Sequence, residues 1–149
     1  MLRIMRRTLL LFLVVLFVSH GSHAAATTGV VPSADGVSIA YTVYGSGSPA
    51  IVFIHGGYVD QTFWRDQVEV LSDQYRMVTL DLAGHGLSGS NREVWSLAAY
   101  GDDVQAVVEA LGLDSVILVG NSLGGPVALS AAEKMPGVVR GIIAVDTFQ

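Results

Sequence analysis

The stretch that decides the fold runs from Ser115 to Met135. It consists of an apolar segment, Ser115–Val119 (SVILV), then Gly120-Asn121-Ser122-Leu123-Gly124-Gly125, then the alanine-rich segment Val127–Met135. The apolar segment is typical of a short buried strand and the alanine-rich one of a helix, which puts G-x-S-x-G on a strand-to-helix turn. On such a turn the serine takes strained backbone angles that hold its Oγ clear of the sheet. The pattern predicts that Ser122 is a nucleophile.

The residues around Ser122 support this prediction. Gly120 and Gly124 leave room for the turn, because a Cβ there would collide with neighbouring backbone. The Leu123 amide lies at the start of the helix, where an unpaired N–H can meet a developing oxyanion. Asn121 and Gly125 are expected to shape the turn rather than react. The alternative interpretation is a small-residue helix start packed tightly on a sheet.

The first 24 residues have the composition of a secretory signal peptide. Three arginines precede the apolar run Leu9–Val18, and small residues follow at positions 22–26. A helix of that run is about 15 Å long, too short for a hydrocarbon core of about 30 Å. We therefore expect cleavage near residues 24–26, a mature domain over residues 27–149, a secreted or periplasmic location and no stable membrane span after cleavage.

Charge and composition exclude several classes of function. The chain has 8 basic and 13 acidic residues and no cysteine. Three of the basic residues lie in the export segment, which leaves a net charge of −8 on the rest. Such an acidic domain is a poor partner for nucleic acid or anionic membranes, and without cysteine it has no disulfide or thiolate metal site. We expect a small-molecule substrate, no cofactor and no metal; the oligomeric state cannot be predicted.

Strands rich in Val, Ile and Leu alternate with helical segments along the chain. This pattern predicts an α/β fold, a mostly parallel sheet with helices on both faces. The expected strands are Thr27–Val31 and Val37–Tyr44, joined by an Asp35-Gly36 hairpin turn, then Ala50–Ile54, Arg76–Leu80, Ser115–Val119 and Val138–Val145. The expected helices are Phe63–Leu71, with Phe63, Trp64, Val68 and Leu71 on one side, then Leu97–Leu111, preceded by Ser96, and Leu123–Met135.

Polar residues stand where several expected strands end. His55, Asp81, Ser122 and Asp146 each follow such a strand. In parallel sheets, ligands bind beyond the carboxyl ends of the strands. We therefore expect the functional site at this edge of the sheet.

Three motifs follow each other in a characteristic order. They are His55-Gly56-Gly57 after one strand, Asp81-Leu82-Ala83-Gly84-His85-Gly86-Leu87-Ser88 after the next, and Gly120–Gly125. As a set they are far more specific than any one alone. From about Val37 to Val145 the chain resembles the α/β-hydrolase superfamily, in its serine-nucleophile, esterase- or lipase-like branch.

The resemblance implies a role for each matching residue. Ser122 matches the nucleophile, and the backbone amides of Leu123 and Gly57 match the oxyanion hole, with Tyr58 as the alternative to Gly57. His55 and Gly56 match loop-supporting positions. In the family, the acid and the histidine of the triad follow the serine in the chain. Here all four histidines precede Ser122. Asp146 is the candidate for the acid of the triad.

The resemblance therefore implies an exported serine hydrolase acting on a small ester-like substrate through an acyl-enzyme. The chain is expected to be its N-terminal fragment, lacking the late strands, the cap and the catalytic histidine, and inactive alone. Val138–Val145 is then expected to form an open, apolar sheet edge.

Several alternatives remain open. One is a catalytically silent truncated chain, a pseudoenzyme or a binding protein. Others, on the same fold, are a carbon–carbon bond hydrolase, an amidase or a haloperoxidase. A serine rather than an aspartate on the turn argues against epoxide hydrolases and haloalkane dehalogenases. Gly84–Gly89 also satisfies G-x-G-x-x-G, but no helix begins at its third glycine, which argues against a dinucleotide site.

Overall fold

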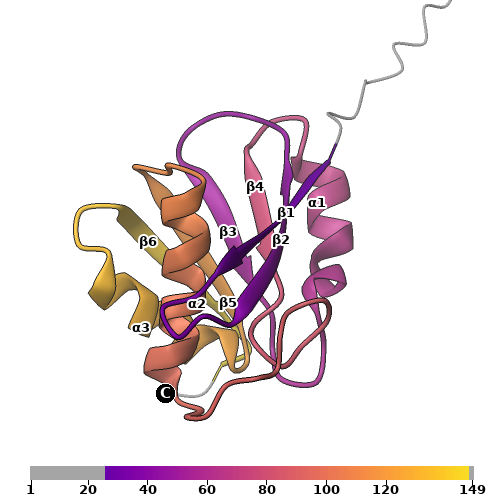
Figure 1. Ribbon diagram of the computed structural model, residues 1–149. Helices are drawn as coiled ribbons and strands as arrows, with labels where there is room; N and C mark the ends of the chain where they lie inside the picture. Colours follow the sequence, from indigo (N-terminus) through magenta and orange to yellow (C-terminus); the bar gives the residue numbers. More distant parts are fainter. Residues whose placement is uncertain (1–25, 148–149) are drawn as a thin grey trace, which may run out of the picture.

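The computed structural model describes residues 26–147, which form a six-stranded sheet flanked by helices (Figure 1). The strands are β1 (Thr27–Pro32), β2 (Ser38–Tyr44), β3 (Ala50–Ile54), β4 (Met77–Leu80), β5 (Val116–Asn121) and β6 (Val139–Val145). The helices are the 3-10 turn η1 (Gln61–Trp64), α1 (Arg65–Leu71), α2 (Leu97–Ala110) and α3 (Gly124–Lys134). The expected signal peptide, residues 1–24, lies outside the described residues.

The sheet is mixed, with the strand order β1-β2-β4-β3-β5-β6. Strands β4, β3, β5 and β6 are parallel to one another, as predicted, while β1 and β2 run antiparallel to their neighbours. The predicted hairpin turn is present, and Gly36 has a φ of 82° there. Strand β2 runs antiparallel to β1 because a short turn joins them, whereas a parallel pair needs a crossover of a dozen or more residues.

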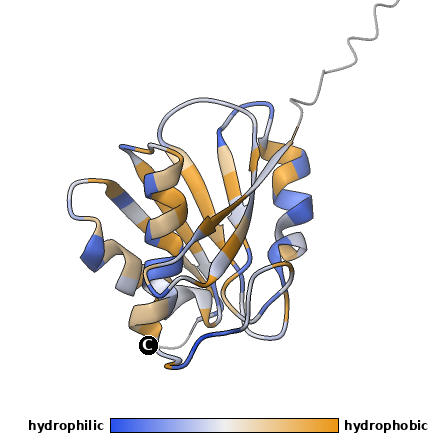
Figure 2. Cartoon of the chain, viewed as in Figure 1, coloured by the Kyte–Doolittle hydropathy of each residue, from blue (hydrophilic) through white to orange (hydrophobic). Residues whose placement is uncertain are grey.

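Alternate residues of the central strands build two separate cores. Val52 and Phe53 point to opposite faces because successive strand side chains alternate. Val52 packs in the core that α2 and α3 cover, whereas Phe53 packs with Trp64 and the residues of α1. Figure 2 shows the hydrophobic central strands between these helices. The prediction of helices on both faces is therefore confirmed.

The first helix begins differently from the prediction. Asp60 caps η1 by accepting a hydrogen bond from the Thr62 amide at 2.8 Å, and the regular helix begins only at Arg65. Trp64 is 3% exposed but Phe63 is 46% exposed, so the prediction that both lie on the same side of the helix is wrong. A 3-10 turn rotates each residue further around the axis than an α-helix does, which turns Phe63 away from the sheet.

Strand β6 lies at one edge of the described sheet. Its apolar side chains are partly uncovered, with Ile143 53% and Val145 39% exposed, which agrees with the expected apolar edge. Among residues 26–147, no helix is both long enough and apolar enough to cross a membrane.

A buried arginine ties distant segments together. The Arg92 and Asp103 side chains are 1% and 0% exposed, and Arg92 Nη1 donates to Asp103 Oδ2 at 3.1 Å. Arg92 Nε also donates to Asp35 in the β1–β2 turn at 2.7 Å. Burial alone would lower the pKa of Arg92, but the hydrogen bonds to Asp103 and Asp35 outweigh it and raise that pKa. Arg92 therefore stays charged and joins the hairpin to helix α2.

We predict that Asp103→Asn destabilises the protein far more than Asp35→Asn. Removing the Asp103 charge leaves a buried cation poorly compensated, at a cost of about 3 kcal/mol. The Asp35 side chain is 39% exposed, so water screens its pair with Arg92 and the loss is about 1 kcal/mol or less. Urea unfolding of both variants measures the difference. Equal losses contradict this account of the network.

Candidate active site

Ser122 lies on the turn between β5 and α3 in a left-handed backbone conformation, with a φ of 49°. The turn is possible because two glycines allow close backbone contacts. A Cβ on Gly120 would meet the Gly124 carbonyl oxygen, and a Cβ on Gly124 would meet the Ile54 carbonyl oxygen. The predicted strand–turn–helix arrangement and the predicted need for these glycines are both confirmed.

The end of β6 holds the same turn from the other side. The Val145 carbonyl oxygen accepts hydrogen bonds from the Ser122 amide at 3.0 Å and from Asn121 Nδ2 at 3.2 Å. Beyond the strand, the Thr147 hydroxyl donates to the Ser122 carbonyl oxygen at 2.7 Å. No pattern in the sequence points to Thr147, because this residue follows an exposed strand and belongs to none of the three motifs.

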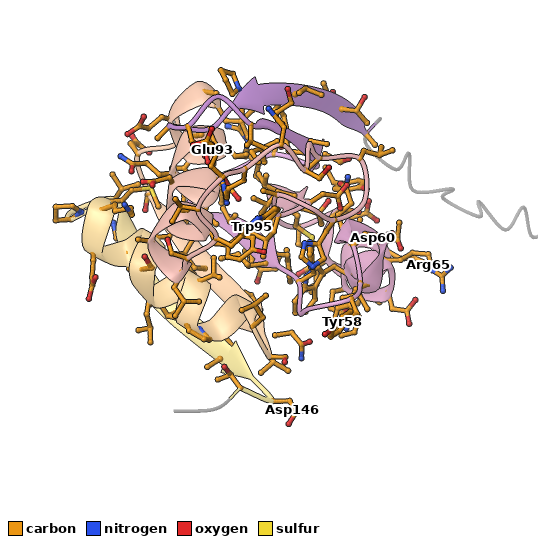
Figure 3. All side chains as sticks on the ribbon, turned by 60° about the horizontal axis from the view of Figure 1, so that its bottom comes forward. Tyr58, Asp60, Arg65, Glu93, Trp95 and Asp146 are labelled. Atoms are coloured by element: carbon orange, nitrogen blue, oxygen red, sulfur yellow. The ribbon has the colours of Figure 1, made fainter. Side chains whose placement is uncertain are left out.

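The loop after β3 lies against the Ser122 turn. Gly56 packs against the turn, since a Cβ built on it would lie 3.3 Å from Ser122 Cβ. The loop after β3 therefore brings Gly57 and Tyr58 to the same edge of the sheet as Leu123. Tyr58 has a φ of 64° and a fully exposed side chain (Figure 3). Within residues 26–147, the amides of Leu123, Gly57 and Tyr58 make no hydrogen bond.

His55 is fully buried and engaged at both ring nitrogens. Nε2 accepts a hydrogen bond from the Leu82 amide at 3.1 Å, and Nδ1 lies 2.6 Å from the Gly56 carbonyl oxygen. Because an amide can only donate, the proton belongs on Nδ1. Burial lowers the pKa of His55 below its ordinary value. His55 is thus a neutral bridge between the loops after β3 and β4.

Asp81, at the carboxyl end of β4, organises its own loop. Its carboxylate is 1% exposed and accepts hydrogen bonds from the amides of Gln61 at 2.7 Å and Leu87 at 2.9 Å. Gly86, with a φ of 49°, leaves the space that this carboxylate fills. The buried Asp81 is a loop-supporting residue, and its packing accounts for Gly86, the middle glycine of the G-x-G-x-x-G pattern.

Two further polar residues, Asp146 and His85, follow the strands β6 and β4. Asp146 has a φ of 45° and projects from the end of β6 with an exposed side chain (Figure 3). His85 Nδ1 lies 3.0 Å from the Ala83 carbonyl oxygen, and its ring centre is 5.0 Å from that of His55. In the part of the chain described, no group of three histidine or acidic side chains could hold a metal ion.

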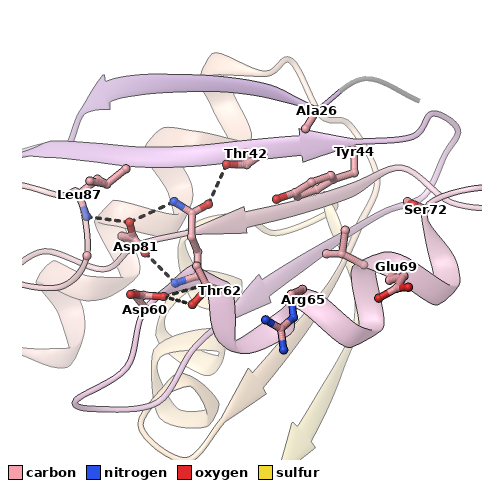
Figure 4. A pocket seen from close by; sticks show the side chains of 13 residues that line it. Ala26, Thr42, Tyr44, Asp60, Thr62, Arg65, Glu69, Ser72, Asp81 and Leu87 are labelled. Carbon is pink, nitrogen blue, oxygen red and sulfur yellow. Dashed lines mark hydrogen bonds between the residues drawn. The ribbon is translucent and has the colours of Figure 1, made fainter. Parts of the chain in front are cut away.

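A cavity of about 1030 Å³ lies between β2, the η1–α1 segment and the loop after β4 (Figure 4). Thr42, Tyr44, Gln61 and Val68 line it, together with the edge of Asp81. Gln61 Oε1 accepts a hydrogen bond from Thr42 Oγ1 at 2.8 Å, so these two polar side chains of the lining are bonded to each other. Neither Ser122 nor Gly57 lines this cavity, which separates it from the turn described above.

We predict that His55 makes the protein less stable as the pH falls. Its pKa in the fold is below the ordinary 6.5, so its contribution is fully present above that pH and is lost as the pH falls through the lowered value. The loss approaches about 1.4 kcal/mol per pH unit for one proton. Urea unfolding between pH 7.5 and 5 should show a steeper loss for the wild type than for His55→Gln. Equal slopes contradict a buried, neutral His55.

Comparison with known proteins places the chain in a family. Residues 49–149 match the family model for the alpha/beta hydrolase fold. An uncharacterized protein of Mycobacterium tuberculosis is 36% identical over 107 residues, which cover 72% of this chain and 31% of the relative. The 2-(acetamidomethylene)succinate hydrolase of Mesorhizobium japonicum is 34% identical over 102 residues, which cover 68% of this chain and 36% of that enzyme.

A solved structure agrees with this assignment. An enzyme described as degrading N-acyl homoserine lactones superposes with a TM-score of 0.75 at 33% identity, covering 80% of this chain and 45% of that one. The chain belongs to the α/β-hydrolase family. It spans about a third of the length of the curated relatives it matches.

Proposed function

We propose that this chain is the nucleophile-bearing, N-terminal part of an exported serine hydrolase that cleaves a small ester-like substrate through an acyl-enzyme at Ser122. The observation that carries the proposal is the left-handed turn at Ser122. It leads directly into α3 and is flanked by the unpaired amides of Leu123 and of Gly57 or Tyr58.

The chemistry follows from these groups. Ser122 Oγ attacks the substrate carbonyl carbon, and the carbonyl oxygen becomes an oxyanion. The amide of Leu123 and that of Gly57 or Tyr58 donate hydrogen bonds to it, each worth about 3 kcal/mol in comparable enzymes. Collapse of this intermediate expels the alcohol and leaves an ester on Ser122, which water then hydrolyses.

A serine hydroxyl needs a general base to react in this way. His55 does not fit, because both of its ring nitrogens are engaged within the loops that it joins. His55 is therefore assigned to loop support and not to proton transfer. Asp146 is the candidate acid: it follows Val145, whose carbonyl accepts the Ser122 amide, and its exposed carboxylate is available to a histidine.

The ester-like substrate is supported by the nucleophile and by a relative. A serine forms an acyl-enzyme, whereas a carboxylate in this position would form the ester intermediate of dehalogenases and epoxide hydrolases. The enzyme described as degrading N-acyl homoserine lactones has a substrate that contains a cyclic ester. Carbon–carbon bond hydrolysis and haloperoxidation use the same turn and are the alternatives within the family.

We predict that a fluorophosphonate probe labels the full-length protein at Ser122. The probe reacts with serines that are activated and faced by an oxyanion hole, so peptide mapping should place the adduct on this residue. Ser122→Ala should abolish labelling. Ser46→Ala, in the exposed turn before β3, is the matched control and should label at the wild-type rate. The intact mass also reports export, through loss of the first 24 or 26 residues.

A folded, full-length protein that takes no label contradicts the proposed mechanism and favours the catalytically silent alternative. Labelling on another serine rejects Ser122 while leaving a serine hydrolase. If the exported protein keeps its first 24 residues, the prediction of a cleaved signal peptide is wrong, but the proposed chemistry at Ser122 is not affected.

A further inference from the structure

We propose that Thr147 is a positioning residue for Ser122, holding the nucleophile turn in its reactive conformation from the end of β6. The inference rests on the proposed function, because it concerns the same serine. Its central observation is the 2.7 Å hydrogen bond from the Thr147 hydroxyl to the Ser122 carbonyl oxygen.

Ser122 needs such support because its φ of 49° is unfavourable for a residue with a Cβ. Left without partners, the residue would relax toward negative φ and swing Oγ away from the two sets of oxyanion donors. The structure holds Ser122 at both of its backbone groups. The amide donates to Val145 at 3.0 Å, and the carbonyl oxygen accepts from Thr147 and, at 3.1 Å, from the Gly125 amide.

The chain path after β6 is shaped to deliver this hydroxyl. Asp146 has a φ of 45°, a conformation that aspartate tolerates better than most residues with a Cβ. This single left-handed residue turns the chain so that Thr147 points back toward the turn after β5. Asp146 therefore has a structural task in the fold, whatever its part in the chemistry.

The second glycine after Ser122 provides the space. A Cβ on Gly125 would collide with the Thr147 side chain, whose Oγ1 and Cβ are the atoms nearest to it. Gly125 is fully helical and has no positive φ that would require glycine. Its lack of a side chain is explained by Thr147, which makes the two residues parts of one contact.

Substitutions at Thr147 test the inference in the full-length protein. Thr147→Val keeps the shape and removes the donor; we expect kcat and the rate of fluorophosphonate labelling at Ser122 to fall about tenfold, the order of one lost hydrogen bond, with KM unchanged. Thr147→Ser restores the hydroxyl and should recover most of the loss. Thr28→Val, on the exposed edge strand β1, is the matched control and should behave as the wild type.

Gly125→Ala provides an independent route, because it displaces Thr147 without changing it and should lower kcat in the same way. Amide hydrogen exchange gives a readout that does not depend on turnover: Thr147→Val should speed exchange at Ser122 and Gly125 specifically. If Thr147→Val keeps the wild-type kcat and exchange, or if Thr147→Ser fails to recover the loss, the inference is wrong. A wild type that is never labelled overturns the proposed function, whereas the exchange result still decides whether Thr147 holds the turn.

Discussion

The close approach of three backbone segments around Ser122 is the constraint on which the site depends. Gly120 on β5, Gly124 at the start of α3 and the Ile54 carbonyl on β3 are so near that a single Cβ at either glycine would force them apart. This packing sets the angle at which α3 leaves the sheet. It also sets the position of the Leu123 amide at the start of α3, so the fold and the proposed oxyanion donor share one cause.

A second group of contacts holds the loops beyond the carboxyl ends of the strands. The neutral His55 bridges Gly56 and Leu82, and Asp103 accepts from the next amide, Ala83, at 3.2 Å. Through Asp103 these loops are connected to the buried charge of Arg92. The loop positions near Ser122 therefore depend on polar groups buried far from the reacting atoms, where partners are costly to lose.

Much of the fold was predictable because local patterns and tertiary packing agree. The apolar runs of β3 and β5 and the spacing of α2 each indicate one structure, and the G-x-S-x-G turn links two of them. Phe63 was mispredicted because its apolar character says nothing about the 3-10 turn that Asp60 initiates. Thr147 was missed because its role depends on a left-handed residue before it. The burial of Asp103 could have been predicted, since it lies on the apolar side of α2, where a carboxylate needs buried hydrogen-bond donors.

The arrangement of the oxyanion donors tests the central claim most directly. A crystal structure of the full-length protein carrying a phosphonate on Ser122 would show where the phosphonyl oxygen lies. The account predicts that it accepts hydrogen bonds from the Leu123 amide and from Gly57 or Tyr58, with Ser122 still at positive φ. An oxygen directed to solvent, or a Ser122 that has relaxed to negative φ, would contradict the assignment of this turn as the catalytic centre.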